Sequence, residues 1–167
     1  IGRFSPVKNH KLALEIISML DKDTYELHIF GDQTLNIGEE SDEYRNEIYK
    51  LIENSDNVIH HGIVHNQDEI YNNIDILLQT SITEASSLVT VESQKYGLPL
   101  VCSLTEASSY AILDGYNGYI CTSNDEYIYA IEYISKNYFE FSKNSMKNSM
   151  KFSSKKYIKT LVNIYEK

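Results

Sequence analysis

The chain has 167 residues, of which 42% are hydrophobic, enough for one globular domain with a buried core. No apolar run reaches the roughly 18 residues that a membrane-spanning helix needs, and two cysteines, Cys102 and Cys121, are too few for a disulfide framework, so a reducing cytoplasm is expected. The formal net charge of −9 argues against nucleic acid as the main partner.

Short strand-like runs and segments of helical periodicity alternate along the chain. Ile1–Phe4 resembles the end of a strand, so we expect an excised domain. Further strands are predicted at 25–30, 58–61, 75–79, 98–103 (opened by Pro99) and 119–122, and helices at 11–20, 41–52 (capped by Ser41 or Asp42), 67–71, 87–96, 108–113, 124–134, 138–150 and 154–165.

This alternation predicts an α/β fold: a Rossmann-like, doubly wound, mostly parallel six-stranded sheet with helices on both faces. Residues 1–137 would form this domain, and residues 138–167 would add C-terminal helices. Residues 143–167 carry a net charge of +6, with lysines recurring every four residues from Lys143 to Lys159. This basic stripe is either a solvated outer face or a surface for an anionic membrane leaflet.

A pair of cations stands near the start of the chain. Arg3 is expected at a strand end and Lys8 in the loop before the first helix. Two cations and a helix N-terminus would suit a phosphate, although solvated surface cations are the simpler alternative.

Two glutamates stand eight positions apart in the segment 81–92. Glu84 would lie on a loop and Glu92 on the following helix, so both could face one pocket at the carboxyl end of the sheet, where open α/β sheets bind ligands. A carboxylate there can hold ribose hydroxyls, and the N–H groups of Ser87, Leu88 and Val89 could receive phosphate oxygens. The alternative is solvated surface charge.

A metal site is not expected. His60 and His61 are neighbours in a strand and would point to opposite faces, which separates them as ligands, and His65 follows in a loop. Cys-x-x-Cys and His-Glu-x-x-His spacings are absent, as are the glycine-rich loops of nicotinamide and ATP sites. The missing acidic cluster after the first strand disfavours a receiver domain.

These elements occur in one order, and the sequence resembles the C-terminal, donor-binding domain of retaining glycosyltransferases of the GT-B fold, family 4. The resemblance covers about residues 1–135. The matching elements are Gly2-Arg3, Lys8-Asn9, Gly31, Gly62, Ser81 with the Glu84-x7-Glu92 pair, Gly97-Leu98-Pro99-Leu100-Val101 and Asp114-Gly115-Tyr116-Asn117-Gly118.

The resemblance implies a sugar transfer from a nucleoside-diphosphate sugar, without a cofactor or metal, in surface polysaccharide, glycolipid or glycan synthesis. Arg3 and Lys8 would bind the diphosphate, Glu84 the donor sugar and Glu92 the ribose. The remaining donor-binding residues that it implies are Gly2, Gly31, Ile63, Val64, Ser81, Ala85, Ser87, Leu88 and Val89. An N-terminal acceptor-binding domain would complete the enzyme, placed in the cytoplasm or on the inner face of the membrane.

Three positions depart from the family pattern. Ala85 and Ser87 stand where the family has glycine, and Tyr110 stands where it often has glutamate. Glycine permits close approach of backbone to ligand, so the sugar pocket is expected to differ. These departures keep one alternative open, a non-catalytic α/β module with a degenerate donor site that binds a partner. A related GT-B epimerase is a further alternative.

Overall fold

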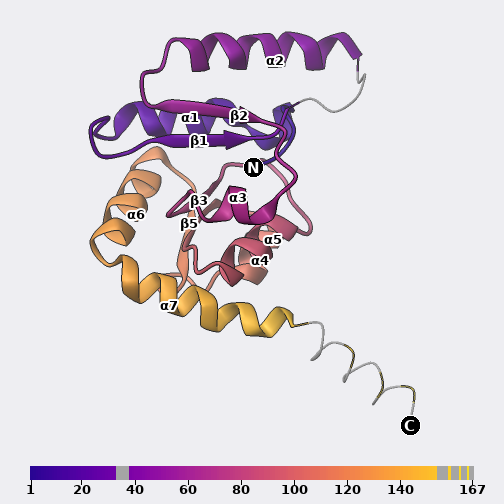
Figure 1. Ribbon diagram of the computed structural model, residues 1–167, viewed down its shortest axis with the longest axis vertical. Coiled ribbons are helices and arrows are strands. Elements are labelled where there is room, and N and C mark those ends of the chain that lie inside the picture. The colour runs from indigo at the N-terminus through magenta and orange to yellow at the C-terminus, as the bar shows by residue number, and fades with distance from the viewer. Residues whose placement is uncertain (33–37, 154–157, 159–161, 163–164, 166–167) are drawn as a thin grey trace.

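The computed structural model describes residues 1–32, 38–153, 158, 162 and 165. Five strands alternate with helices in it (Figure 1). The elements in chain order are η1 (Pro6–Lys8), α1 (His10–Met19), β1 (Leu27–Phe30), α2 (Gly38–Glu53), β2 (Val58–Gly62), α3 (Gln67–Tyr71), β3 (Leu77–Gln79), α4 (Leu88–Lys95), β4 (Leu100–Ser103), α5 (Glu106–Ala111), β5 (Gly118–Cys121), α6 (Asn124–Lys136), α7 (Tyr138–Ser149) and η2 (Met150–Phe152).

All strand pairs are parallel, which confirms the α/β class. The strands form two sheets in the described residues, with the orders β1-β2 and β3-β4-β5. In Figure 1 the first sheet lies above with α1 and α2, and the second lies below with α4 and α5. β4 is buried except at Ser103, as a parallel strand covered by helices requires, whereas β2 leaves Ile59 and His61 exposed.

The prediction of one six-stranded sheet is wrong for the residues described. Ile1–Phe4 forms no strand, and its tie to β1 is a single bond in which the Gly2 N–H donates to the Phe30 carbonyl at 2.8 Å. A segment that reaches only the end of β1 has too few rungs for a ladder, so the two sheets stay separate and Arg3 lies outside any strand.

Two smaller boundaries also differ. The second helix begins at Gly38, ahead of the predicted Ser41 or Asp42 cap, and Pro99 precedes β4 rather than opening it. Proline lacks the N–H that a ladder needs, so the strand starts at the next residue. The helix predicted over 154–165 falls almost wholly outside the described residues.

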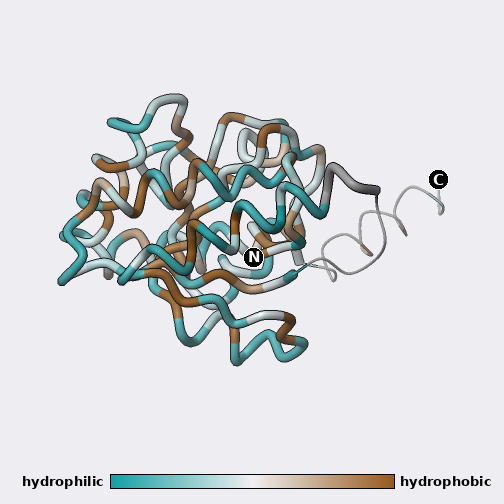
Figure 2. Tube along the Cα trace, turned by 90° about the horizontal axis from the view of Figure 1, so that it is seen from above, coloured by the Kyte–Doolittle hydropathy of each residue, from teal (hydrophilic) through white to brown (hydrophobic). Residues whose placement is uncertain are grey.

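Apolar side chains from both sheets meet the helices in the core. Helical coils alternate between hydrophilic and hydrophobic segments in Figure 2, as amphipathic helices do. The largest buried cluster joins α1, β4, β5, α6 and α7 through Ile16, Ile17, Leu20, Val101, Cys121, Tyr127, Ala130, Ile131, Ile134 and Phe141. Cys102 and Cys121 are free, buried thiols whose pKa values burial raises, and both pack as small apolar residues in the core.

Helix α7 packs on the domain through polar groups as well. The Ser145 hydroxyl donates to the Leu98 carbonyl at 2.6 Å, and the Asn148 amide donates to Gln94 at 2.8 Å. In the described part Lys143, Lys147 and Lys151 are exposed, and no helix there is long and apolar enough to cross a membrane. The domain boundary at 137 and the membrane contact stay predictions.

Candidate active site at the carboxyl ends of the strands

The loop that carries Lys8 is held by the segment that follows β3. Asn9 links η1 to α1 with a φ of 50°, which turns the chain sharply. The Thr80 hydroxyl lies within 3.1 Å of the Lys8 carbonyl and 2.9 Å of the Asn9 carbonyl. The Ile82 N–H donates to the Val7 carbonyl at 2.8 Å. Two loops more than 70 residues apart in sequence are therefore fastened to each other.

Two glycines let the chain cross at the end of β1. A Cβ on Gly31, where φ is +117°, would stand 2.2 Å from the Gly2 carbonyl oxygen, far inside contact distance. Gly2 in turn lies beneath the Lys8 side chain, since a Cβ there would be 3.6 Å from the Lys8 Cε. The structure thus brings together the predicted residues Gly2, Gly31 and Lys8.

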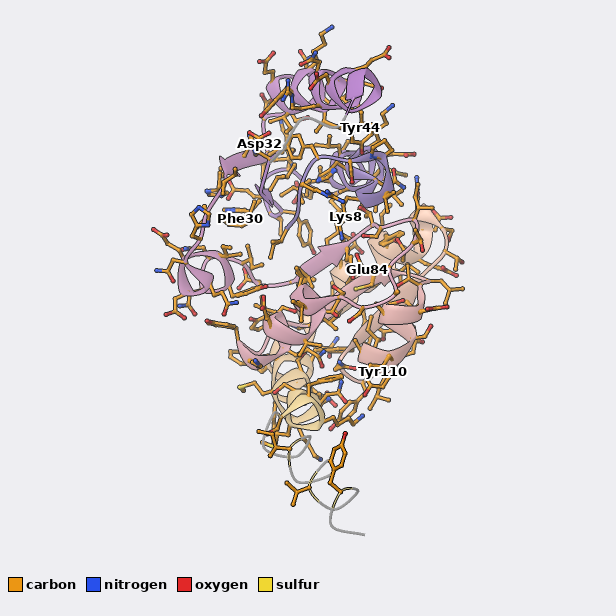
Figure 3. All side chains as sticks on the ribbon, turned by 90° about the vertical axis from the view of Figure 1, so that its right-hand side faces the viewer. Lys8, Phe30, Asp32, Tyr44, Glu84 and Tyr110 are labelled. Carbon is orange, nitrogen blue, oxygen red and sulfur yellow. The ribbon has the colours of Figure 1, made fainter. Side chains whose placement is uncertain are left out.

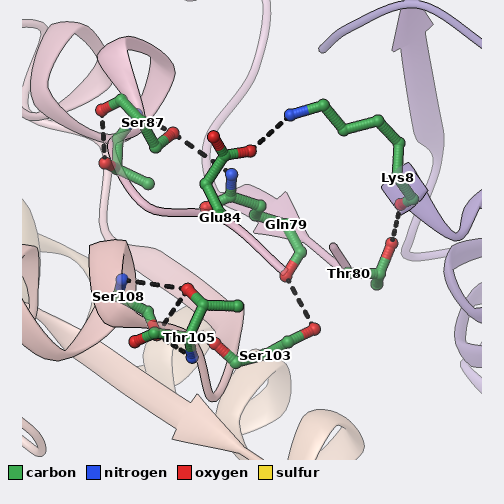
Figure 4. A network of polar contacts seen from close by, with 9 residues as sticks. Lys8, Gln79, Thr80, Glu84, Ser87, Ser103, Thr105 and Ser108 are labelled. Atoms are coloured by element: carbon green, nitrogen blue, oxygen red, sulfur yellow. Dashed lines mark hydrogen bonds and ion pairs between the residues drawn. The ribbon is translucent and has the colours of Figure 1, made fainter. Parts of the chain in front are cut away.

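Lys8 and Glu84 form an ion pair. The Lys8 Nζ lies 2.5 Å from a Glu84 carboxylate oxygen, and the two side chains are 28% and 17% exposed. In Figures 3 and 4 they face each other from opposite loops. The backbone of Glu84 is fixed as well, because its carbonyl accepts from the Ala107 N–H at 2.9 Å. The predicted catalytic cation and sugar carboxylate are therefore direct partners.

Helix α4 begins next to this pair with Ser87 as its N-cap. The Ser87 hydroxyl accepts from the Thr90 N–H at 3.3 Å and from the Gln79 amide at 3.1 Å. This cap binds the N–H of Thr90, the third residue of the helix. The N–H groups of Leu88 and Val89 lie in the first turn and have no acceptor within the helix. The predicted helix start is thus present, with Leu88 exposed, and its role toward phosphate stays a prediction.

Glu92 has a partner of its own. The Tyr71 hydroxyl donates to a Glu92 carboxylate oxygen at 2.8 Å, and the Tyr71 ring stacks on Tyr96 with centroids 5.0 Å apart. Burial and this carboxylate raise the pKa of Tyr71. The two glutamates of the motif therefore sit in different local networks, Glu84 with Lys8 and Glu92 with Tyr71.

The remaining predicted site residues vary in exposure. Arg3, Ile63 and Ala85 are exposed, Val64 is half-buried, and Ser81 is buried. Arg3 makes no ion pair among the residues that the structure describes. The Ser81 hydroxyl likewise has no partner within them, although it is 1% exposed. The ligand roles of these residues stay predictions.

The histidines separate as the strand geometry predicts. The His60 ring lies by the Gly31 carbonyl at 2.8 Å and near Phe4, whereas His61 stacks on Phe30 with centroids 4.3 Å apart. No group of three or more His, Cys, Asp or Glu side chains in the described part of the chain could hold a metal ion. His10, just after Lys8, is buried, and burial first, then the amino terminus, Lys8 and His60, lower its pKa to about 4.

Tyr110 lies on α5 with its ring 77% exposed and its edge toward Phe152 at 5.5 Å between centroids. A phenol in place of a carboxylate removes a charge at this position. Apart from this edge contact with Phe152 of η2, the Tyr110 ring is exposed.

Sequence reasoning missed the residues that position the charged groups. Thr80, Gln79 and Tyr71 each bond to a predicted site residue or its backbone, and none was singled out. Gln79 ends the strand before the glutamate motif, and Thr80 directly follows it. This position at the end of a strand could have identified both residues from the sequence. Tyr71 ends a short helix, and nothing local in the sequence ties it to Glu92.

The arrangement suits an anion. Lys8 carries three N–H donors, of which Glu84 takes one, and the exposed guanidinium of Arg3 follows Gly2 in the chain. The first turn of α4 adds backbone donors and the positive end of a helix dipole. A carboxylate beside them can accept hydroxyl groups, so the site can hold a ligand with both phosphate and hydroxyl functions.

Comparison with solved structures finds the same fold in several proteins, glycosyltransferases among them. A glycosyltransferase from Rickettsia africae superposes with a TM-score of 0.82 at 18% identity, over 98% of this chain and 45% of that one. Anabaena Alr3699/HepE in complex with UDP and glucose gives 0.78 at 17%, over 90% and 43%. The pneumococcal O-GlcNAc transferase GtfA in complex with UDP and GlcNAc gives 0.76 at 18%, over 99% and 34%. At these identities the likeness establishes the fold, one Rossmann-like half of a GT-B enzyme.

Sequence comparison gives the family. An uncharacterized 41.2 kDa protein in the cps region of Klebsiella pneumoniae is 27% identical over 168 residues, which are 99% of this chain and 43% of that protein. The chain therefore spans less than half the length of this relative and of the three structures above. The family model described as glycosyl transferases group 1 matches residues 1–152, nearly the whole chain. The chain belongs to the group 1 glycosyl transferases.

Proposed function

We propose that this chain forms the donor-binding half of a retaining glycosyltransferase that moves a hexose-type sugar from a nucleoside-diphosphate sugar to an acceptor. The observation that carries the proposal is the Lys8–Glu84 pair beside Gly2 and the start of α4. The ligands of the Anabaena and pneumococcal structures support a UDP-linked donor. The cps-region relative supports a role in surface polysaccharide synthesis.

The cations Lys8 and Arg3 would stabilise the negative charge that develops on the leaving diphosphate. Cleavage of a sugar–phosphate bond leaves negative charge on the nucleotide, and fixed cations stabilise that charge most in the transition state. Lys8 can donate to a phosphate oxygen while it stays bonded to Glu84, because its ammonium has three donors. Arg3 and the N–H groups of Leu88 and Val89 would complete the anion site without a metal.

The two glutamates would bind the sugar units on either side of the diphosphate. Glu84, held by Lys8, keeps acceptor capacity on its carboxylate for donor-sugar hydroxyls. Glu92 is bonded through one oxygen to Tyr71 and can accept ribose hydroxyls with the other. Ala85 and Ser87 border this region and would shape the sugar pocket.

A donor titration tests the proposal. We expect the chain to bind UDP, GDP or one of their sugars in calorimetry, and Lys8→Gln to weaken that affinity by at least about ten-fold, since a hydrogen bond to a charged group contributes about 1.5–3 kcal/mol. Lys143→Gln, on the exposed face of α7, is the matched control and should bind as the unmodified chain does.

Two results would contradict the proposal. Folded protein that binds none of these ligands would favour the non-catalytic module, and equal affinity of the Lys8→Gln variant would remove Lys8 from the site. Retention is read separately, from the anomeric configuration of the product that the whole enzyme forms, and an inverted product would overturn that part.

A further inference from the structure

Glu92 is a half-buried carboxylate whose hydrogen-bond donor in the described part of the chain is a neutral phenol. The Tyr71 hydroxyl donates to one of its oxygens at 2.8 Å, and no ion pair among the described residues includes Glu92. An ionised carboxylate accepts up to about four hydrogen bonds, so Tyr71 leaves most of its acceptor capacity available. A half-buried charge of this kind favours a ligand that brings hydrogen-bond donors.

We propose that Tyr71 is a positioning residue that holds Glu92 for the ribose of the nucleotide and thereby makes the site select ribose over deoxyribose. The inference rests on the proposed function, in which Glu92 binds the ribose hydroxyls. Tyr71 itself is only 3% exposed, so it acts through Glu92 and does not touch the nucleotide. Its hydroxyl decides which oxygen of Glu92 faces the ligand.

The Tyr71 hydroxyl has a fixed direction because its ring is locked by packing. The ring belongs to a buried apolar cluster with Phe30 and Leu98, and it stacks on Tyr96 with centroids 5.0 Å apart. Burial first, and then the Glu92 carboxylate, raise the pKa of Tyr71, so the phenol keeps the proton that it donates. A glutamate side chain is flexible, and a bond to a locked phenol restricts it to one orientation.

Glu92 lies on the same face of α4 as the start of the helix. It follows Leu88, the first residue of α4, by four positions, and helical residues four apart share one face. Helical side chains lean toward the N-terminus, so Glu92 leans toward the first turn, whose N–H groups would bind the diphosphate. Because one helical turn rises only about 5.4 Å, the hydroxyl and phosphate groups of one nucleotide can reach both.

A neutral partner suits a carboxylate that binds hydroxyl groups. Lys8 places a positive charge against Glu84, whereas the phenol of Tyr71 leaves the full negative charge on Glu92. Hydroxyls donate more strongly to a charged acceptor, while a phosphate would be repelled by it. A positioned carboxylate also discriminates against a ligand without those hydroxyls, because the carboxylate is then desolvated without gaining a partner.

Calorimetry with paired nucleotides tests the inference. The probes are the nucleoside diphosphate that the chain binds, UDP or GDP, and its dideoxyribose analogue, which lacks both ribose hydroxyls. The unmodified chain should bind the ribonucleotide at least about ten-fold more tightly than the analogue. Glu92→Ala should abolish this affinity ratio, and Tyr71→Phe, which removes only the phenol hydroxyl, should lower it at least about three-fold.

Tyr96→Phe is the matched control. It removes the same atom from the ring that stacks on Tyr71, and that hydroxyl also ties the end of α4 to α3, by donating to Asp68 at 2.6 Å. The Tyr96→Phe variant therefore loses a comparable link between the two helices without losing the donor to Glu92. It should keep the affinity ratio of the unmodified chain, whatever its denaturation midpoint.

The outcomes separate this inference from the proposed function. If Glu92→Ala lowers the ratio and Tyr71→Phe does not, the inference is overturned and the proposed function stands. An equal fall in Tyr71→Phe and Tyr96→Phe would assign the effect to the packing of α3 on α4, which also overturns it. A ratio near one in the unmodified chain, or one that Glu92→Ala leaves unchanged, would remove Glu92 from the ribose. If the unmodified chain binds neither UDP nor GDP, the proposed function fails and the inference fails with it.

Discussion

The two ends of the parallel strands are held together in different ways. At the carboxyl ends, loops from distant parts of the sequence are tied by Thr80, by the Ile82–Val7 backbone bond and by the Lys8–Glu84 pair. Toward the amino ends of β1 and β3, a cavity separates the two sheets. Polar contacts therefore fix the candidate site, whereas β1 and β3 share no backbone ladder in the described residues.

The largest expected effect comes from crowding the chain crossing at the carboxyl end. Gly31→Ala would place a Cβ 2.2 Å from the backbone oxygen of Gly2, which no side-chain rotation relieves, at a φ of +117°. We expect a loss of about 3 kcal/mol or more in the free energy of unfolding, measured by chemical denaturation.

The matched control lies in the turn before β5. Gly115 also has a positive φ, +70°, but a Cβ there would meet nothing within 4 Å. Gly115→Ala should therefore cost only about 1–2 kcal/mol, the strain of the left-handed backbone. Equal losses in the two variants would mean that the crossing is looser than the structure shows.

A second effect of similar size follows from His10, which is buried beside the Lys8 loop. Its pKa is lowered from 6.5 in the unfolded chain to about 4 in the folded protein. Between pH 6.5 and pH 4 His10 is protonated in the unfolded chain but neutral in the folded protein, so the free energy of unfolding falls as the pH drops through this range. Above pH 6.5 His10 is neutral in both states, and its contribution to stability is constant. The free energy of unfolding should fall by up to about 1.4 kcal/mol per pH unit in this range, and by about 3 kcal/mol in total.

The pH dependence is measured by denaturation at a series of pH values. His10→Phe removes the titrating group and should flatten the curve between pH 6.5 and 4. His65→Gln, on an exposed loop, is the control and should leave the curve unchanged. If the His10→Phe curve keeps the original slope, other groups account for it.

The sequence predicts those features of the two strand ends that depend on local residue pattern, and misses those that depend on contacts between distant segments. Apolar periodicity placed the helices and strands, because it reflects which side chains face the core. The resemblance to the glycosyltransferase family assigned Lys8, Glu84 and Gly31 to one donor site. It did not predict that Lys8 pairs with Glu84, or Glu92 with Tyr71, since such pairs depend on how loops meet in three dimensions.

The sheet itself shows the same limit. Ile1–Phe4 has the composition of a strand end, and a six-stranded sheet was predicted from it. Whether a segment becomes a strand depends on a ladder of several rungs, and the structure supplies a single one between Gly2 and Phe30. Pattern indicates which residues favour a strand, whereas pairing decides whether the strand forms.

The smallest expected effect isolates the tie between the two loops. Thr80→Val keeps the side-chain shape but removes the hydroxyl that bonds to the Lys8 and Asn9 carbonyls, so stability should fall by about 1 kcal/mol. Because the tie positions the backbone of Lys8, the variant should also bind nucleoside diphosphate more weakly, which rests on the proposed function. Thr80→Ser restores the hydroxyl and should recover both properties.

Thr24→Val provides the comparison at the amino end of β1. Its hydroxyl bonds to Asp21 on the surface ahead of β1, at the end of the strand opposite the candidate site, so its loss should leave ligand affinity unchanged. Denaturation and calorimetry on the same samples separate the two readouts. If Thr80→Val lowers stability while its affinity matches that of Thr24→Val, the tie serves the fold alone; if affinity falls only in Thr80→Val, the position of Lys8 depends on it.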